Sequence, residues 1–217
     1  MSSRDLPMRI RCLCHFDGEH LIREPSVLHI SDGRIAAITA GPADRETAFL
    51  MPGLVEAHAH LFLDGDELDA DRRAAHLEKS PSVLIATGEA NLHRLLAAGI
   101  TLLRDAGDRH GVNLAVRDIA RARLLDGIAA PKIRACGPAL RKRGRYGSFM
   151  AVDVRDADEA HRAVLRLPEG IDDCKILATG IIDFANGCVK GPPQFMPDEL
   201  ALLVAAGLAV YGMFWVM

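Results

Sequence analysis

Apolar and polar residues alternate over short segments in the first fifty residues of the chain. Two such segments, 27–30 and 34–38, flank Ser31-Asp-Gly33, a tight-turn signal between apolar runs. Phe16-Asp-Gly18 reads as a second turn. The pattern therefore predicts a small unit of short β-strands over residues 1–50.

From Leu50 onward the pattern becomes an alternation of short apolar runs and longer helical segments. The runs that we predict as strands are 54–60, 100–104, 132–136 and 173–178. The predicted helices cover 80–98, 112–126, 156–167 and a segment that opens at Met196-Pro-Asp-Glu199, with 137–150 as an irregular loop. Ser80-Pro81 is a typical helix start, because a capping residue precedes proline at the first helical position.

Four β–α units in succession predict parallel strands joined by right-handed crossovers. A doubly wound sheet would fit that count. A barrel is favoured because polar residues end the strands, as they do where barrel enzymes place their chemistry; they are His58, His60, Arg104, Asp105 and Lys175. We therefore expect an α/β fold, the N-terminal part of a (β/α)8 barrel with about four units. Residues 51–217 would form this incomplete barrel, preceded by a small β-sandwich-like unit at 1–50.

Composition narrows the class of protein. The chain is 49% hydrophobic and 25% charged, so it can bury a core. A net charge of -3 gives no reason to expect a nucleic-acid partner. The odd number of cysteines, five, at irregular spacing favours a reducing compartment, and the N-terminus has no apolar run of signal-peptide length. We expect a cytoplasmic protein, in which Cys12 and Cys14 are small strand residues in preference to metal ligands.

His58 and His60 are the first candidates for chemistry. They lie two apart at the end of a predicted strand, so both side chains point to one face. Inside a barrel, two imidazoles on one face can converge on a single divalent ion. The alternative is a pair of loop-edge histidines that bond to the backbone.

The segment that contains these histidines, Met51-Pro-Gly-Leu-Val-Glu-Ala-His-Ala-His60, resembles the first-strand signature of the amidohydrolase superfamily. The chain is most similar to its imidazolonepropionase-like and prolidase-like members. Three further stretches agree with the resemblance, which runs from about residue 10 to 206: Ser31-Asp-Gly-Arg-Ile-Ala-Ala-Ile38, Gly99-Ile-Thr-Leu-Leu-Arg-Asp105 and Asp173-Cys-Lys-Ile-Leu-Ala-Thr-Gly180.

The resemblance gives Lys175 a role. In binuclear members a lysine that ends the fourth strand is carboxylated by carbon dioxide, and its carbamate bridges two metal ions. The resemblance thus implies a site of one or two divalent ions, with zinc favoured, held by His58, His60 and a carboxylated Lys175. The alternative is a lysine that reaches solvent or pairs with Asp105 or Asp173.

Two groups of charged residues have weaker claims to function. Arg104 and Asp105 could orient ligands or substrate, and a structural ion pair at the barrel rim is an equal alternative. The segment Arg141-Lys-Arg-Gly-Arg145 could meet an acidic substrate group, although a solvated basic loop is favoured.

The family also uses a histidine after each of the fifth and sixth strands and an aspartate after the eighth. The last histidine here is His161, and the segment 207–217 starts like the fifth strand. We therefore expect a C-terminally truncated chain or a fragment, with its catalytic residues unknown. The uncharged segment 200–217 also meets the length of a membrane span, but the strand–helix alternation disfavours that alternative.

The resemblance implies a metal-dependent hydrolase that cleaves C–N bonds in amides, cyclic amides or N-acyl and dipeptide-like small molecules. The alternative is a catalytically inactive metal-binding fragment or remnant, which could pair with another chain as an oligomer. Bound metal together with turnover would separate the two.

Overall fold

The computed structural model describes residues 8–42, 49–180, 182–183, 187–189, 191–211 and 214–216. The chain divides into two compact units, Met1–Gly53 and Leu54–Met217.

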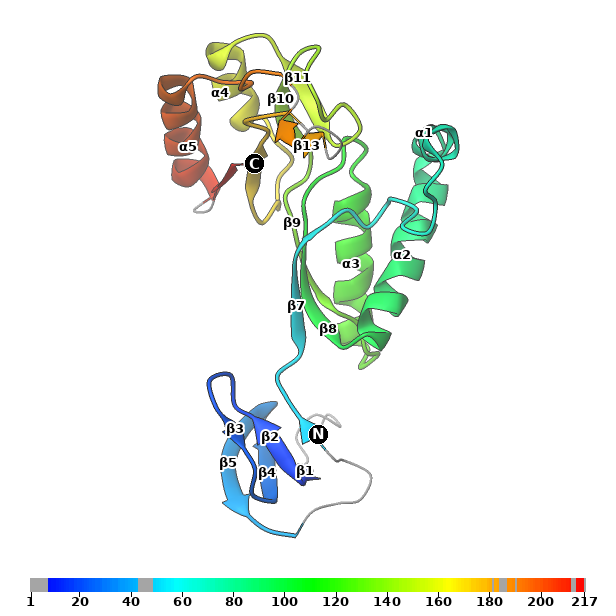
Figure 1. The fold of residues 1–217 in the computed structure, drawn as a ribbon, viewed down its shortest axis with the longest axis vertical. Helices are drawn as coiled ribbons and strands as arrows, with labels where there is room; N and C mark the ends of the chain where they lie inside the picture. Colours follow the sequence, from blue (N-terminus) through cyan, green and yellow to red (C-terminus); the bar gives the residue numbers. More distant parts are fainter. Residues whose placement is uncertain are drawn as a thin grey trace. The chain divides into compact units, whose positions relative to one another are not determined.

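The first unit contains two small sheets (Figure 1). One has the order β1-β4-β5 and consists of β1 (Met8–Cys12), β4 (Ser26–Ser31) and β5 (Arg34–Ala40), all antiparallel. The other has the order β3-β2-β6 and consists of β2 (Cys14–Phe16), β3 (Leu21–Ile22) and β6 (Phe49–Leu50). Their packing as a β-sandwich stays a prediction.

Both turns predicted in this unit are confirmed. Asp32 and Gly33, between β4 and β5, have φ angles of 52° and 69°, the left-handed pair that a tight hairpin requires. The second turn joins β2 to β3, where Asp17 accepts hydrogen bonds from the backbone N–H groups of Glu19 and His20. Cys12 is buried on β1 and donates through Sγ to the carbonyl of Ser26, as a small strand residue does.

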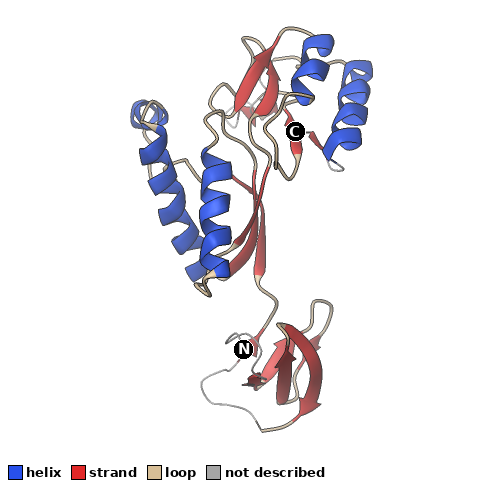
Figure 2. Ribbon diagram, turned by 180° about the vertical axis from the view of Figure 1, so that it is seen from behind, coloured by secondary structure: helices blue, strands red, loops and turns tan. Residues whose placement is uncertain are grey.

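The second unit begins with a three-stranded parallel sheet. Its strands, in the order β7-β8-β9, are β7 (Leu54–Ala59), β8 (Ile100–Asp105) and β9 (Lys132–Ala135). The helices α2 (Pro81–Ala97) and α3 (Val112–Leu125) both lie against one side of this sheet, as Figures 1 and 2 show. A Cβ on Gly88 of α2 would lie 2.8 Å from Val116 of α3, so glycine permits the two helices to approach closely. These strands and helices confirm the corresponding sequence predictions.

The rest of the unit holds a four-stranded parallel sheet in the order β11-β10-β12-β15. Its strands are β10 (Ala139–Lys142), β11 (Ala151–Val154), β12 (Cys174–Ile176) and β15 (Phe214–Val216). The helices α4 (Ala157–Val164) and α5 (Pro197–Tyr211) pack with it around a buried apolar core, and β13 (Ile182–Asp183) pairs with β14 (Cys188–Val189). The predicted strand 173–178 and the helices at 156 and 197 are confirmed.

Three local features were either predicted wrongly or missed. The segment 137–150, expected as a loop, contains β10, whose Ala139 and Leu140 are fully buried while the following residues are charged. The helix α1 (Ala70–Leu77) was missed because it is short and charged; the Asp69 carboxylate caps it by accepting from the N–H groups of Asp71 and Arg72.

The third error concerns the end of the chain, where a strand was expected from residue 207. Instead α5 continues to Tyr211, and a strand follows only at Phe214–Val216. The helix persists because Leu203 and Ala206 of α5 are buried in the core that it shares with α4. None of the helices within the described residues has the length and apolar character needed to span a bilayer.

Candidate metal centre

His60 follows directly after β7, and one of its ring nitrogens is held by the backbone. Nδ1 lies 2.8 Å from the carbonyl oxygen of Gly107, in the loop after β8. Because a carbonyl can only accept, Nδ1 carries the proton and Nε2 keeps its lone pair. Burial, reinforced by the charge of Lys175, lowers the pKa of His60 to about 4, so the ring is neutral at pH 7.

His58 lies on β7, two residues before His60 and on the same side of the strand. The two rings meet edge to face with their centroids 5.3 Å apart. Burial lowers the pKa of His58, with a further contribution from the charge of Lys175. Both imidazoles therefore favour the neutral form that binds a metal ion.

Lys175 lies on β12 with only 1% of its surface exposed. Its Nζ donates to the carbonyl oxygen of Ala106 at 2.7 Å and lies 3.4 Å from the sulfur of Met150. Burial lowers the pKa of Lys175 to about 8, although Cys136 and Asp105 act in the opposite direction. At neutral pH the unprotonated, nucleophilic amine is therefore more abundant than for a lysine in water.

These three side chains come from two strands that are far apart in the sequence. Lys175 is close enough for its charge to lower the pKa of both histidines, and its hydrogen bond to Ala106 ties β12 to the end of β8. The structure thus brings together the three residues that the sequence singled out. Their role as metal ligands stays a prediction.

Asp105 ends β8 and has no exposed surface. Its carboxylate accepts hydrogen bonds from the N–H of Leu61 at 2.8 Å, the N–H of Gly107 at 3.0 Å and the side-chain amide of Asn113 at 3.3 Å. Burial raises the pKa of Asp105 to about 6, against the effect of those hydrogen bonds. Asp105 therefore holds two backbone segments next to His60. One is Leu61, the residue after His60, and the other is Gly107, whose carbonyl oxygen contacts the His60 ring.

Arg104 has a structural partner. Its Nε lies 3.0 Å from Asp173, whose other oxygen is 2.9 Å from Arg134. Because Asp173 is only 1% exposed, two arginines compensate one buried carboxylate. Arg104 therefore forms a structural ion pair, which was one of the two roles expected for it from the sequence. Asp105 instead holds the backbone around His60.

Basic side chains of the segment 141–145 also contact other residues of the chain. Arg141 lies 2.7 Å from Asp153, and Lys142 lies 3.8 Å from Glu199. Arg145 bonds to the backbone carbonyl of Pro192. These contacts give the segment a structural role.

Two neighbours of His60 were missed from the sequence. Gly107 has a φ angle of 112°, and the ring of Phe149 lies 5.9 Å from that of His60. Gly107 could have been noticed, because a glycine two residues after a strand that ends in an acidic residue indicates a tight loop. No local pattern connects Phe149 with His60.

The donor set fits a divalent metal ion in its chemistry. His60 offers a free Nε2 in a fixed orientation, and His58 is a second neutral imidazole. No group of three or more His, Cys, Asp or Glu side chains within the described residues is arranged to hold a metal. The two imidazoles supply two donors, and Lys175 is the buried side chain beside them.

Comparisons with known proteins agree with this reading of the fold. The Amidohydrolase family model matches residues 49–212, and no curated protein matches the chain. Similar solved structures include a Xaa-Pro dipeptidase with bound methionine, at 20% identity and a TM-score of 0.71, covering 97% of this chain and 56% of that one. Phenylurea hydrolase B gives 19% identity and a TM-score of 0.68, with 97% and 55% covered. The A. niger ochratoxinase gives 22% identity and a TM-score of 0.64, with 93% and 53% covered.

The chain therefore has the mixed α/β fold of these proteins and spans about half the length of each. Because the family model matches most of its residues, the chain belongs to the amidohydrolase family.

Proposed function

We propose that this chain carries the first half of a metal-dependent hydrolase that cleaves a C–N bond in a small molecule. The observation that carries the proposal is the convergence of His60, held with Nε2 unprotonated, on the buried Lys175. Residues 51–217 would supply about four β–α units of a barrel, and residues 1–50 a separate β-unit. The family match and the hydrolases among the similar structures support this assignment.

In this proposal His58, His60 and Lys175 bind one or two divalent ions, with zinc favoured by the imidazole and oxygen donors. Such an ion would supply a Lewis acid that activates water and polarises the substrate carbonyl. The residues of this chain provide the positioning. Gly107 orients the ring of His60, and Asp105 holds the backbone of Leu61 and Gly107 in place.

Lys175 would act after modification by carbon dioxide. The neutral amine attacks the carbon of carbon dioxide, a C–N bond forms, and one proton leaves to solvent. The product is an anionic carbamate, an oxygen donor suited to hard and borderline divalent ions. Its remaining N–H can keep the 2.7 Å hydrogen bond that Nζ already makes to Ala106. Carboxylation would replace a buried positive charge by a negative one, which a bound divalent cation would compensate.

The substrate classes that we propose are amides, cyclic amides and N-acyl or dipeptide-like molecules. The Xaa-Pro dipeptidase among the similar structures supports the last of these.

Metal content and turnover of the purified chain test the proposal together. After zinc loading and removal of free metal, we expect at least one ion per chain, lost in His58→Ala and kept in His161→Ala. His161 is an exposed residue of α4 and serves as the matched control. Hydrolysis of a panel of N-acyl amino acids, dipeptides and cyclic ureides should depend on His58. Metal binding without any turnover would contradict the hydrolase and support a non-catalytic metal-binding protein.

A further inference from the structure

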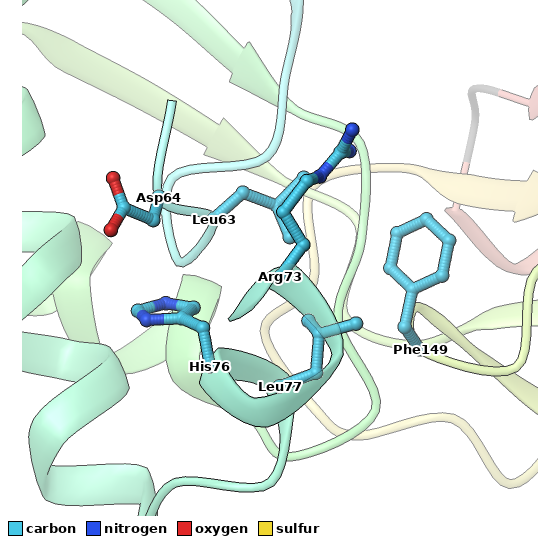
Figure 3. A pocket seen from close by; sticks show the side chains of 6 residues that line it. All are labelled: Leu63, Asp64, Arg73, His76, Leu77 and Phe149. Carbon is cyan, nitrogen blue, oxygen red and sulfur yellow. The ribbon is translucent and has the colours of Figure 1, made fainter. Parts of the chain in front are cut away.

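A small apolar hollow lies next to the candidate metal centre, between α1 and the segment before β11. It has a volume of about 60 Å³ and is shown in Figure 3. Leu63, Leu77 and Phe149 form its apolar wall. A second hollow of about 140 Å³ shares Leu77 and Phe149 with the first.

Phe149 connects these hollows to the candidate metal ligands. Its ring centroid lies 5.9 Å from that of His60 and 6.4 Å from that of Phe62. A molecule with its reacting bond at His60 can therefore extend an apolar substituent over Phe149. The larger hollow is lined by polar as well as apolar side chains, among them Glu78, Arg109 and His110, so the apolar contact is made at Phe149 and Leu77.

Arg73 places a positive charge at this apolar surface. In Figure 3 its side chain rises from α1 between Leu63 and Phe149, and the carboxylate of Asp64 points the other way. Asp64 instead accepts a hydrogen bond from the N–H of Asp66. Within the described part of the chain, Arg73 makes no ion pair.

Tyr146 supplies a second donor. Its ring packs edge to face on Phe149, with 6.0 Å between centroids, and it lies near enough to Arg73 to sense the guanidinium charge. The described residues provide no acceptor for its hydroxyl group. A guanidinium that lines the apolar hollow, with a phenol packed on the Phe149 ring of the same hollow, matches a carboxylate attached to an apolar group.

We propose that Arg73 and Tyr146 bind the carboxylate of a substrate whose apolar or aromatic side chain rests on Phe149 and Leu77. The pair makes the site select anionic substrates over neutral amides of the same shape. This inference rests on the proposed function, because only an enzyme has a substrate. Binding of the anion itself does not require a bound metal ion. The chain's net charge of -3 disfavours anions in general, so a preference for them must arise locally.

Binding of two probes to the metal-free chain tests the inference. The probes are N-acetyl-L-phenylalanine, which is anionic at pH 7, and N-acetyl-L-phenylalaninamide, which is neutral. Calorimetric titration at low salt should show the anion binding about 10-fold or more tightly, as expected for charge-assisted hydrogen bonds. Arg73→Ala should abolish the preference, Arg73→Lys should restore part of it, and Tyr146→Phe should reduce it about threefold.

Arg72→Ala is the matched control. Arg72 neighbours Arg73 on α1, is exposed and pairs with Glu67 at 3.5 Å, but does not line the hollow. It should keep the preference of the unaltered chain. The inference is overturned if the unaltered chain binds neither probe or binds both equally, or if Arg72→Ala loses as much as Arg73→Ala.

Zinc content measured on the same samples separates the two proposals. If zinc binding is normal but Arg73→Ala does not change the preference for the anionic probe, only the proposed anion site is contradicted. An anion preference in a chain that binds no zinc would sink the proposed hydrolase and leave the anion site standing.

Discussion

The carboxylate of Asp105 accepts a hydrogen bond from the backbone N–H of Leu61 at 2.8 Å, which joins the end of β8 to the residue after His60. The same carboxylate accepts from the N–H of Gly107, whose carbonyl holds the His60 ring. One fully buried side chain thus positions both backbone segments that fix His60.

Asp105→Asn should destabilise the protein and weaken its affinity for zinc. The amide keeps one acceptor oxygen and turns an NH₂ group toward a backbone N–H, leaving at least one buried donor without a partner. We expect the free energy of unfolding to fall by about 1–3 kcal/mol and zinc affinity to fall about 10- to 100-fold. Urea denaturation and zinc titration measure the two effects. Asp126→Asn, at an exposed helix end, should change stability by less than about 0.5 kcal/mol; equal effects of the two substitutions would contradict this role.

Gly107→Ala should cost more than Gly99→Ala. Both glycines have positive φ angles, 112° and 84°, so alanine is strained at either position. A Cβ at Gly107 would lie 3.1 Å from the carbonyl oxygen of Gly137 and 3.3 Å from that of Met150, whereas at Gly99 it meets nothing within 4 Å. We expect losses of about 1–3 kcal/mol at Gly107 and about 1 kcal/mol at Gly99 in thermal unfolding. The opposite order would show that crowding around Gly107 is unimportant.

Lys175→Met should stabilise the metal-free protein at pH 7, since it removes a buried charge and keeps an apolar stem. The folded pKa of Lys175, about 8, is below the usual 10.5, so the cost of its charge is complete below pH 8. That cost disappears as the pH rises from 8 toward 10.5. The gain over the unaltered chain should therefore be about 1–3 kcal/mol at pH 7 and should shrink over that range.

Urea denaturation in carbon-dioxide-free buffer at several pH values measures the effect of Lys175→Met. Lys132→Met, at an exposed position on β9, provides the control and should show no such pH dependence. A loss of stability in Lys175→Met at pH 7 would mean that the ammonium group is well compensated in the fold.

Much of the framework could be predicted from the sequence because its signals are local. The turn at Asp32-Gly33, the Pro81 helix start and the apolar run into His58 and His60 each depend on neighbouring residues. The helix α1 and the strand β10 were not predicted because neither has a strong apolar period. A side-chain cap stabilises α1, and tertiary burial stabilises β10.

The candidate site divides in the same way. The pattern at His58 and His60, with the resemblance that added Lys175, found the residues that converge. The hydrogen bonds of Asp105 to Leu61 and of His60 to Gly107, and the contact of Phe149 with His60, join residues more than 40 positions apart. Such contacts depend on how the strands are placed side by side, which no local pattern encodes.

The central claim is that His60 binds a metal ion, and zinc titration of His60→Ala tests it most directly. We expect the unaltered chain to bind at least one zinc ion and His60→Ala to bind it about 100-fold or more weakly, while His161→Ala retains the original affinity. Circular dichroism of each variant controls for folding. A folded His60→Ala variant that binds zinc as tightly as the unaltered chain would contradict the account.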